Sequence, residues 1–219
     1  MERKVFAFLG DFYHQREPLE LAVQTAVRGV GDVEIAFQLP TSESMNHALD
    51  QNPMMIILGA ENRINPEDEI VRNWLTDELD NRLEAYVAAG GSLLVLHSGL
   101  ASYPPDSKYR KMIKGEFLSH PPEHCQVRYY SEDDGVPLNG NASYDYVVID
   151  EFYVVDVDTE DTNVFLYSEC EEHGTGLAGW HHTYGEGKVM CLVPTHNKEG
   201  FEHAETLRLY HKTIEWGLC

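Results

Sequence analysis

Residues 90–99 read Gly90-Gly91-Ser92-Leu93-Leu94-Val95-Leu96-His97-Ser98-Gly99. An unbroken apolar run between glycines is typical of a strand that helices cover on both faces. His97 and Ser98 follow at the carboxyl end of this strand. Ligands of open α/β sheets bind just outside the carboxyl ends of the strands, so both side chains are candidate catalytic groups. The alternative is a core histidine whose ring bonds to a backbone carbonyl.

Outward from that strand, the preceding residues alternate between short apolar runs and helical patterns. Strands are predicted at 5–9, 33–37 and 54–58, with a helix beginning near Pro18 and a brief helix from about residue 42 between them. Alternation of this kind is typical of parallel strands joined by right-handed crossovers. The first half of the chain therefore predicts an α/β fold with a mostly parallel sheet.

The segment just before the central strand carries the clearest helix pattern. Asn65 is a suitable N-cap, and Pro66 suits the first helical position. Apolar side chains then recur at helical spacing until Gly90-Gly91, at Ile70, Trp74, Leu79, Leu83 and Val87. This pattern predicts one helix over 66–89 whose apolar stripe faces the sheet.

After residue 100 the alternation gives way to successive strand patterns. Strands are predicted at 126–130, 146–157, 164–167 and 188–193, followed by a closing helix at 202–216. These strands either extend the sheet or form an antiparallel subregion.

The composition restricts the classes of partner. The chain has 219 residues, enough for one sizeable core, and we expect residues 1–219 to form a single domain. With 16 basic and 37 acidic residues, the formal net charge of −21 repels nucleic-acid phosphates and anionic lipid headgroups. No nucleic acid and no membrane is therefore expected as a partner, whereas an uncharged sugar or a divalent cation is compatible with this charge.

Cysteine usage and the amino terminus favour a cytoplasmic location. Cys125, Cys170, Cys191 and Cys219 show neither paired metal-ligand spacing nor the density of a secreted disulfide scaffold. The apolar run at 5–9 is too short for the core of a signal peptide, and no run approaches membrane-spanning length. A reduced cytosol fits these observations best.

Four of the 11 histidines lie at predicted strand ends or in the adjoining loops: His14, His97, His120 and His196. Neutral imidazole is a common metal ligand and is well matched to proton transfer near neutral pH, so either use would explain the grouping. His203 follows His196 by seven residues and could face the same site. Taken singly, each histidine is more often a structural or surface residue.

Asp150 and Glu151 interrupt an otherwise apolar and aromatic run. Because side chains alternate along a strand, one carboxylate would face the core unless it meets a cation, a hydrogen-bond donor or a substrate hydroxyl. The pair is therefore a candidate site, and the alternative is a strand end at which both groups reach water. Tyr153 and Trp180 offer flat apolar faces for a sugar ring, although aromatic residues in strands are usually packing residues.

The order of these motifs is similar to that of the ThuA-like (trehalose utilisation) family. The resemblance rests on residues 90–99, 115–121 and 150–153, on Trp180 with 184–189, on Thr195-His196, and on Glu215-Trp216. It covers residues 85–217, and the amino-terminal part matches in pattern only. The family implies a flavodoxin-like three-layer α/β sandwich, as in class I glutamine amidotransferases, with additional strands in the C-terminal half.

The resemblance also implies a sugar-related role, because members of the family are tied to the use of disaccharides or keto-sugars. Related sugar-active proteins imply a divalent metal, zinc or manganese, for which His97, Glu151, His196 and His203 would be suitable ligands. Relatives with glutaminase activity place a cysteine nucleophile just after the strand that ends here in His97. This chain has no thiol at that position, which disfavours thiol-based glutaminase chemistry.

Two functions remain open from the sequence. The first is an enzyme for a neutral disaccharide or keto-sugar, in which His97 acts as base, acid or metal ligand beside Asp150 or Glu151. Ser98 and His196 would complete its polar cluster, and the substrate-binding residues would be His14, His120, Tyr153 and Trp180. The second is a non-catalytic carbohydrate-binding or regulatory module that kept the fold without the cysteine nucleophile. A homo-oligomer is compatible with both.

Overall fold

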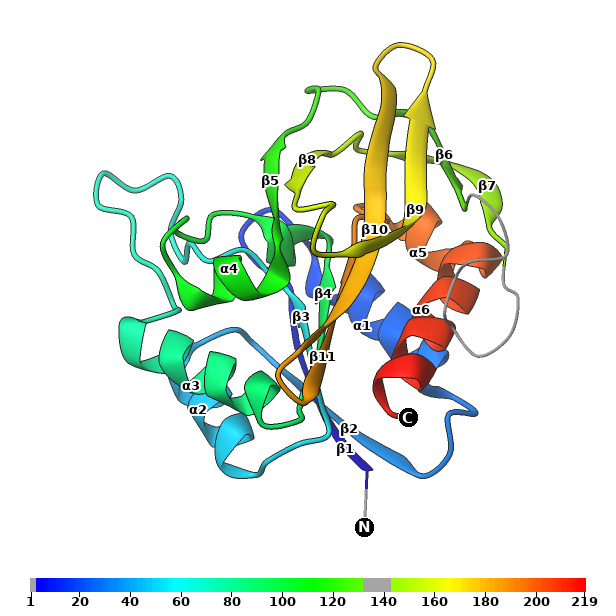
Figure 1. The fold of residues 1–219 in the computed structure, drawn as a ribbon. Helices are drawn as coiled ribbons and strands as arrows, with labels where there is room; N and C mark the ends of the chain where they lie inside the picture. The colour runs from blue at the N-terminus through cyan, green and yellow to red at the C-terminus, as the bar shows by residue number, and fades with distance from the viewer. Residues whose placement is uncertain (1–2, 132–142) are drawn as a thin grey trace.

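The computed structural model describes residues 3–131 and 143–219, and one large sheet runs through the described part (Figure 1). Five neighbouring strands of this sheet run parallel: β2 (Val33–Gln38), β1 (Arg3–Leu9), β3 (Met55–Gly59), β4 (Ser92–Leu96) and β11 (Gly187–Leu192). Four strands continue the sheet beyond β11, each antiparallel to the one before: β10 (Gly174–Tyr184), β9 (Asn163–Cys170), β6 (Cys125–Tyr130) and β7 (Asp145–Asp150). A separate antiparallel pair consists of β5 (Gly115–Ser119) and β8 (Val154–Val157). The predicted α/β class, a mostly parallel core sheet with added strands from the C-terminal half, is confirmed.

Helices cover both faces of this sheet (Figure 1). On one face lie α1 (Arg16–Val27), α5 (Lys198–Glu202) and α6 (Ala204–Gly217), and on the other lie α2 (Ser42–Asp50), α3 (Asp77–Ala88) and α4 (Lys108–Ile113). Every residue of β3 and β4 is buried between the two layers, as expected for parallel strands that are covered on both sides. Within residues 3–131 and 143–219, no helix has the length and apolar character to cross a membrane.

The helix before β4 is shorter than the sequence predicts. It begins only at Asp77, where the side chain of Thr76 caps its first turn, and residues 65–75 form turns instead. Ile70, which the expected stripe placed against the sheet, is 78% exposed. The prediction of one helix over 66–89 was therefore wrong in its first half.

The predicted strand over 146–157 is interrupted. β7 ends at Asp150, and residues 151–153 leave the ladder before β8 begins at Val154. The two carboxylates thus lie at a strand end, which is the alternative that the sequence left open. They nevertheless do not face water, because Asp150 is 0% and Glu151 is 7% exposed.

Candidate functional site

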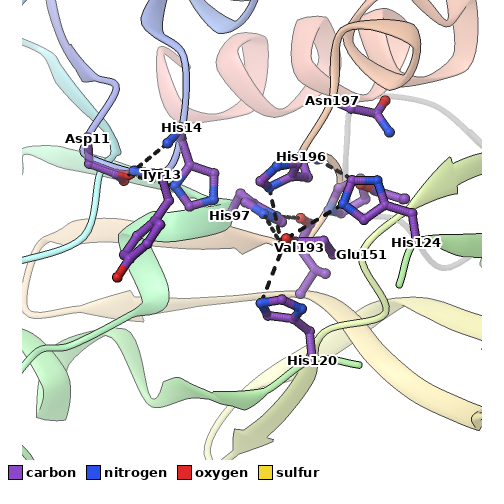
Figure 2. Close-up of polar contacts among 12 residues, drawn as sticks. Asp11, Tyr13, His14, His97, His120, His124, Glu151, Val193, His196 and Asn197 are labelled. Atoms are coloured by element: carbon purple, nitrogen blue, oxygen red, sulfur yellow. Dashed lines mark hydrogen bonds and ion pairs between the residues drawn. The ribbon is translucent and has the colours of Figure 1, made fainter. Parts of the chain in front are cut away.

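Side chains from four strand ends converge at one edge of the sheet (Figure 2). His14 follows β1, His97 follows β4, His196 follows β11 and Glu151 follows β7. Each of these residues offers one possible ligand atom, and the four atoms lie within 4.8 Å of one another. We call this group the His/Glu cluster. It joins His97, Glu151 and His196 with His14, which the sequence grouped with the histidines at strand ends and assigned to substrate binding.

Three ring nitrogens of the cluster are buried without a hydrogen-bond partner: His14 Nε2, His97 Nε2 and His196 Nδ1. Glu151 Oε2 lies 3.3 Å from His97 Nε2 and 3.2 Å from His196 Nδ1, close enough for attraction but without the alignment of a hydrogen bond. Leaving a buried polar atom unpaired costs about 1–3 kcal/mol of stability. A cation bound by all three nitrogens and the carboxylate would remove this cost, so the arrangement is suited to a shared cation. Three imidazole nitrogens and one carboxylate oxygen form a donor set that suits zinc or manganese.

Two of the rings are fixed in the tautomer that a metal ligand needs. Nδ1 of His97 lies 2.7 Å from the Val193 carbonyl oxygen, and Nδ1 of His14 lies 2.6 Å from Asp11 Oδ1. Because these oxygens only accept hydrogen bonds, Nδ1 carries the proton in each neutral ring and Nε2 keeps the lone pair. Outer hydrogen bonds of this kind orient metal-binding histidines.

Asp150 and Ser98, both predicted to be catalytic, hold other groups in place. Asp150 is fully buried, and its Oδ1 accepts a hydrogen bond from the His196 backbone N–H at 2.8 Å. Its Oδ2 accepts a second one from the Tyr129 hydroxyl, also at 2.8 Å. Ser98 is buried as well, and it helps to lower the pKa of the neighbouring Asp11 carboxyl. This geometry makes both residues positioning residues rather than groups that face a substrate.

Burial and the contacts within the cluster shift the pKa values of its members. Burial alone would raise the pKa of Glu151, but the His196 and His97 rings outweigh it and hold the pKa well below its usual value. Burial lowers the pKa of His97, against the opposing effect of Glu151. Burial also acts to lower the pKa of His196, but there Glu151 outweighs it and the pKa is raised. Glu151 is therefore an anion and His97 is neutral near neutral pH, the states in which they can bind a metal.

His97 follows β4 directly and is the first residue of a short 3₁₀-helix, η1 (His97–Leu100), where its φ of 43° lies in the left-handed region. A non-glycine residue in that region carries strain that the surrounding packing must hold. The packing here is tight, because a Cβ at Gly99 would lie 2.4 Å from the Leu58 carbonyl oxygen of β3. This packing thus holds the His97 ring at the carboxyl end of β4, beside the other members of the cluster.

A cavity of about 480 Å³ opens over the His/Glu cluster. Its lining includes three members of the cluster and seven further residues: Tyr13, Glu61, Arg63, Ala101, Phe117, His120 and Tyr153. The Tyr153 ring stacks on the His97 ring with 4.0 Å between centroids, so one of its faces is taken up by packing. Tyr153 is therefore part of the wall and also a support for His97.

Two further imidazoles approach Glu151 from the other side (Figure 2). His120 Nε2 and His124 Nε2 lie 3.7 Å and 3.8 Å from Glu151 Oε1, and their side chains are 35% and 38% exposed. Nδ1 of His120 donates to the Pro121 carbonyl oxygen at 2.7 Å, so the lone pair of its neutral ring lies on Nε2. His124 lies four residues after His120, but no pattern in the sequence singled it out as a site residue.

Glu61 and Arg63 also line the cavity, and neither was predicted from the sequence. Glu61 is 2% exposed, and its Oε2 accepts hydrogen bonds from Arg63 Nε and from the Ser102 hydroxyl, both at 2.7 Å. Its Oε1 is buried with no hydrogen-bond partner. The signal was available, because Glu61 follows β3 at the same edge of the sheet as His97.

Two predicted site residues lie elsewhere. Trp180 is 0% exposed, and its indole nitrogen donates to the Ile113 carbonyl oxygen at 2.8 Å, so it has no free face for a sugar ring. His203 caps α6: its Nδ1 accepts a hydrogen bond from the Glu205 backbone N–H at 3.3 Å, and its ring stacks on Tyr146. Trp180 is a core residue and His203 is outside the His/Glu cluster, which corrects both predictions.

Comparison with known proteins adds to this description. The family model ThuA, described as trehalose utilisation, matches residues 4–217. A ThuA-like protein from Parabacteroides merdae has a TM-score of 0.75 at 11% identity, covering 100% of this chain and 90% of that chain. A cytoplasmic protein from Salmonella typhimurium has a TM-score of 0.65 at 12% identity, covering 98% of both chains.

The fold also occurs within a larger enzyme. The GH42 β-galactosidase Gan42B from G. stearothermophilus has a TM-score of 0.61 at 13% identity, covering 99% of this chain but 30% of that chain. At such identities a likeness shows the fold alone, and no curated protein matches the chain in sequence. The family model, in contrast, spans nearly all of the chain and agrees with its sheet and its motifs, so the chain belongs to the ThuA (trehalose utilisation) family.

Proposed function

We propose that this protein is a metal-dependent enzyme that moves a proton on an uncharged keto-sugar, either free or within a disaccharide. The observation that carries this proposal is the set of three buried, unpaired ring nitrogens around Glu151 at the base of the cavity. The family description, trehalose utilisation, supports a sugar as the class of substrate.

The His/Glu cluster would hold one divalent ion, zinc or manganese, through three nitrogens and one carboxylate oxygen. Such an ion, when bound, polarises a carbonyl or hydroxyl oxygen as a Lewis acid. The protein's own contribution is the orientation of the donors. Asp11 and the Val193 carbonyl fix two of the rings, and Asp150 holds the backbone of the third.

His120 is the proposed proton carrier. Its Nε2 faces the cluster while its ring stays partly exposed, so the neutral ring can take a proton from the carbon next to a carbonyl. Returning that proton to a neighbouring atom gives an isomer with no change in oxidation state. His124, at a similar distance from Glu151, would exchange protons between this position and solvent.

The opposite wall of the cavity suits sugar hydroxyls. Glu61 Oε1 has no hydrogen-bond partner and can accept from a hydroxyl, and the guanidinium of Arg63 beside it can donate to one. Tyr13, which is 49% exposed, adds an aromatic face. The net charge of −21 disfavours phosphorylated sugars, so we propose a neutral substrate.

Metal content provides the first test. Purified protein is dialysed against chelator, titrated with zinc or manganese, and its bound metal is measured by elemental analysis. We expect one equivalent per chain, and at least about tenfold weaker binding in His97→Ala and Glu151→Gln. His47→Ala is the matched control, because His47 is exposed on α2 and outside the cluster. Binding that is equal in all four proteins would contradict the metal site.

Solvent exchange tests the proton transfer. The metal-loaded protein is incubated with keto-sugars in D₂O, and deuterium at the carbon next to the carbonyl is followed by NMR. We expect His120→Gln to lose about 10²–10⁴-fold in exchange rate while it still binds metal. Sugar binding without exchange or isomerisation in the wild type would instead establish the non-catalytic binding module.

A further inference from the structure

A second cluster of reactive side chains lies outside the cavity, where β6 begins and β9 ends. Cys125 Sγ and Cys170 Sγ are 2.8 Å apart, although the residues are 45 positions apart in the sequence. The two strands are hydrogen-bonded neighbours in the main sheet. Cys170 is 2% exposed and Cys125 is half-buried, so a small reagent can reach the pair through Cys125.

We propose that Cys125 and Cys170 form a redox-active thiol pair that closes reversibly to an intramolecular disulfide. A disulfide bond is about 2.05 Å long, so the sulfurs need to approach by less than about 1 Å. The two sulfurs already face each other from neighbouring strands, so closing the bond requires only a small movement. In the reducing cytoplasm that the sequence predicts, the pair would rest as two thiols and oxidise only transiently.

The competing use of these groups is a metal site with His173, whose possible ligand atom lies within 4.8 Å of both sulfurs. Two thiolates on one zinc ion, each about 2.3 Å from it in tetrahedral geometry, stand roughly 3.8 Å apart. The observed separation of 2.8 Å is much shorter. The geometry therefore favours a bond between the sulfurs over a shared ion.

The oxidant is a low-molecular-weight disulfide such as oxidised glutathione. The Cys125 thiolate attacks one sulfur of the reagent, which forms a mixed disulfide and releases one glutathione thiol. The Cys170 thiolate then attacks the Cys125 sulfur, which forms the protein disulfide and releases the second glutathione. In sum, the protein loses two electrons and two protons, and the reagent is reduced to two thiols.

The local environment makes this reaction slow at neutral pH. Burial, together with Cys170 and with Glu172 nearby, raises the pKa of the Cys125 thiol to about 12. Few molecules therefore carry the attacking thiolate at pH 7. The oxidation should therefore accelerate as the pH rises, and excess reagent or a stronger oxidant such as diamide should shorten the time that it takes.

Peptide mapping after oxidation tests the proposal. The metal-free protein is treated with excess oxidised glutathione or diamide, denatured, alkylated and digested. We expect two of the four cysteines to resist alkylation, a peptide pair joined through Cys125 and Cys170, and reversal by dithiothreitol. The oxidised protein should unfold roughly 5–10 °C higher than the reduced protein, because the bond closes a loop of 45 positions.

Three variants separate the outcomes. Cys125→Ser and Cys170→Ser should each abolish both the linked peptides and the gain in thermal stability. Cys219→Ser should leave both intact, because Cys219 is an exposed residue at the end of the chain. A glutathione adduct on Cys125 that never resolves would overturn the proposal. So would the loss of one bound zinc from unoxidised Cys170→Ser but not from Cys219→Ser.

Discussion

At the scale of single residues, the site depends on groups that never face a substrate. Asp11 shows this best: its carboxylate holds the His14 ring at 2.6 Å and also accepts a hydrogen bond from the Glu61 backbone N–H at 2.9 Å. One buried acid thus joins the His/Glu cluster to the cavity wall that carries Glu61. Asp150 plays the same part for His196. Loss of either acid should disturb the geometry of the cavity without removing a reacting group.

The lowered pKa of Asp11 should also make the stability of the fold depend on pH. Burial by itself raises the pKa of Asp11, but His14 outweighs it and lowers the pKa to about 2 from an ordinary value of 3.8. A carboxyl group with a depressed pKa stabilises the fold above its unfolded pKa, and this stability is lost as the pH falls from about 5 towards 2. The contribution is about 2 kcal/mol. Chemical unfolding of chelator-treated protein should therefore show a steeper loss between pH 5 and pH 2.5 in the wild type than in Asp11→Asn. Parallel curves would show that the contact contributes nothing.

At the scale of elements, local patterns identified most strands but misjudged where elements end. The central strand was predicted from its continuous apolar run between glycines, and the closing helix from its apolar periodicity. The helix over 66–89 failed because Asn65, an apparent N-cap, instead accepts a hydrogen bond from the Arg72 backbone N–H and closes a loop. The eleven-residue strand β10 was not predicted, because its glycines break the apolar pattern. Local propensity cannot show which of two competing hydrogen-bond partners a capping residue takes.

Glycines at which two elements pack closely allow this packing to be tested by substitution. A Cβ at Gly115, at the start of β5, would lie 2.1 Å from the Trp180 ring, which is fixed by its hydrogen bond to Ile113. Gly115→Ala should therefore lower the free energy of unfolding by about 1–3 kcal/mol in denaturant titrations. Gly217→Ala is the matched control, because its Cβ would clash only with the flexible end of Met55 and would make an ordinary contact with Ser92 at 3.6 Å. The idea fails if both variants are equally stable.

At the scale of the whole molecule, charge and topology have separate consequences. The net charge is −21, so the excess acidic side chains repel one another in the folded state. Added salt screens this repulsion and should therefore stabilise the protein. We expect the midpoint of thermal unfolding at pH 7.5 to rise by a few degrees, roughly 2–5 °C, between 20 and 200 mM NaCl. The same titration near the pI of about 4.7 should show little change. A midpoint that falls with salt at pH 7.5 would mean that attractive ion pairs dominate.

The strand order of the sheet brings Glu151 to the same edge as His97. β7 lies at the far edge of the sheet from β2, yet four successive antiparallel pairings after β11 turn it to the same direction as β4. Its carboxyl end, and with it Glu151, therefore points to the same edge as His97. No local pattern in the sequence states this strand order, because it results from long-range pairing.

The amino-acid sequence alone determined the α/β class, the buried strand that ends in His97, the acidic surface and the types of side chain available for chemistry. These follow from periodicity and composition, which act over a few residues or over the whole surface. The tertiary structure alone decided that His14 joins His97, Glu151 and His196, that Asp150 turns away to hold a backbone, and that Trp180 belongs to the core. Such outcomes depend on contacts between segments far apart in the chain, where packing and burial select one partner for each polar group.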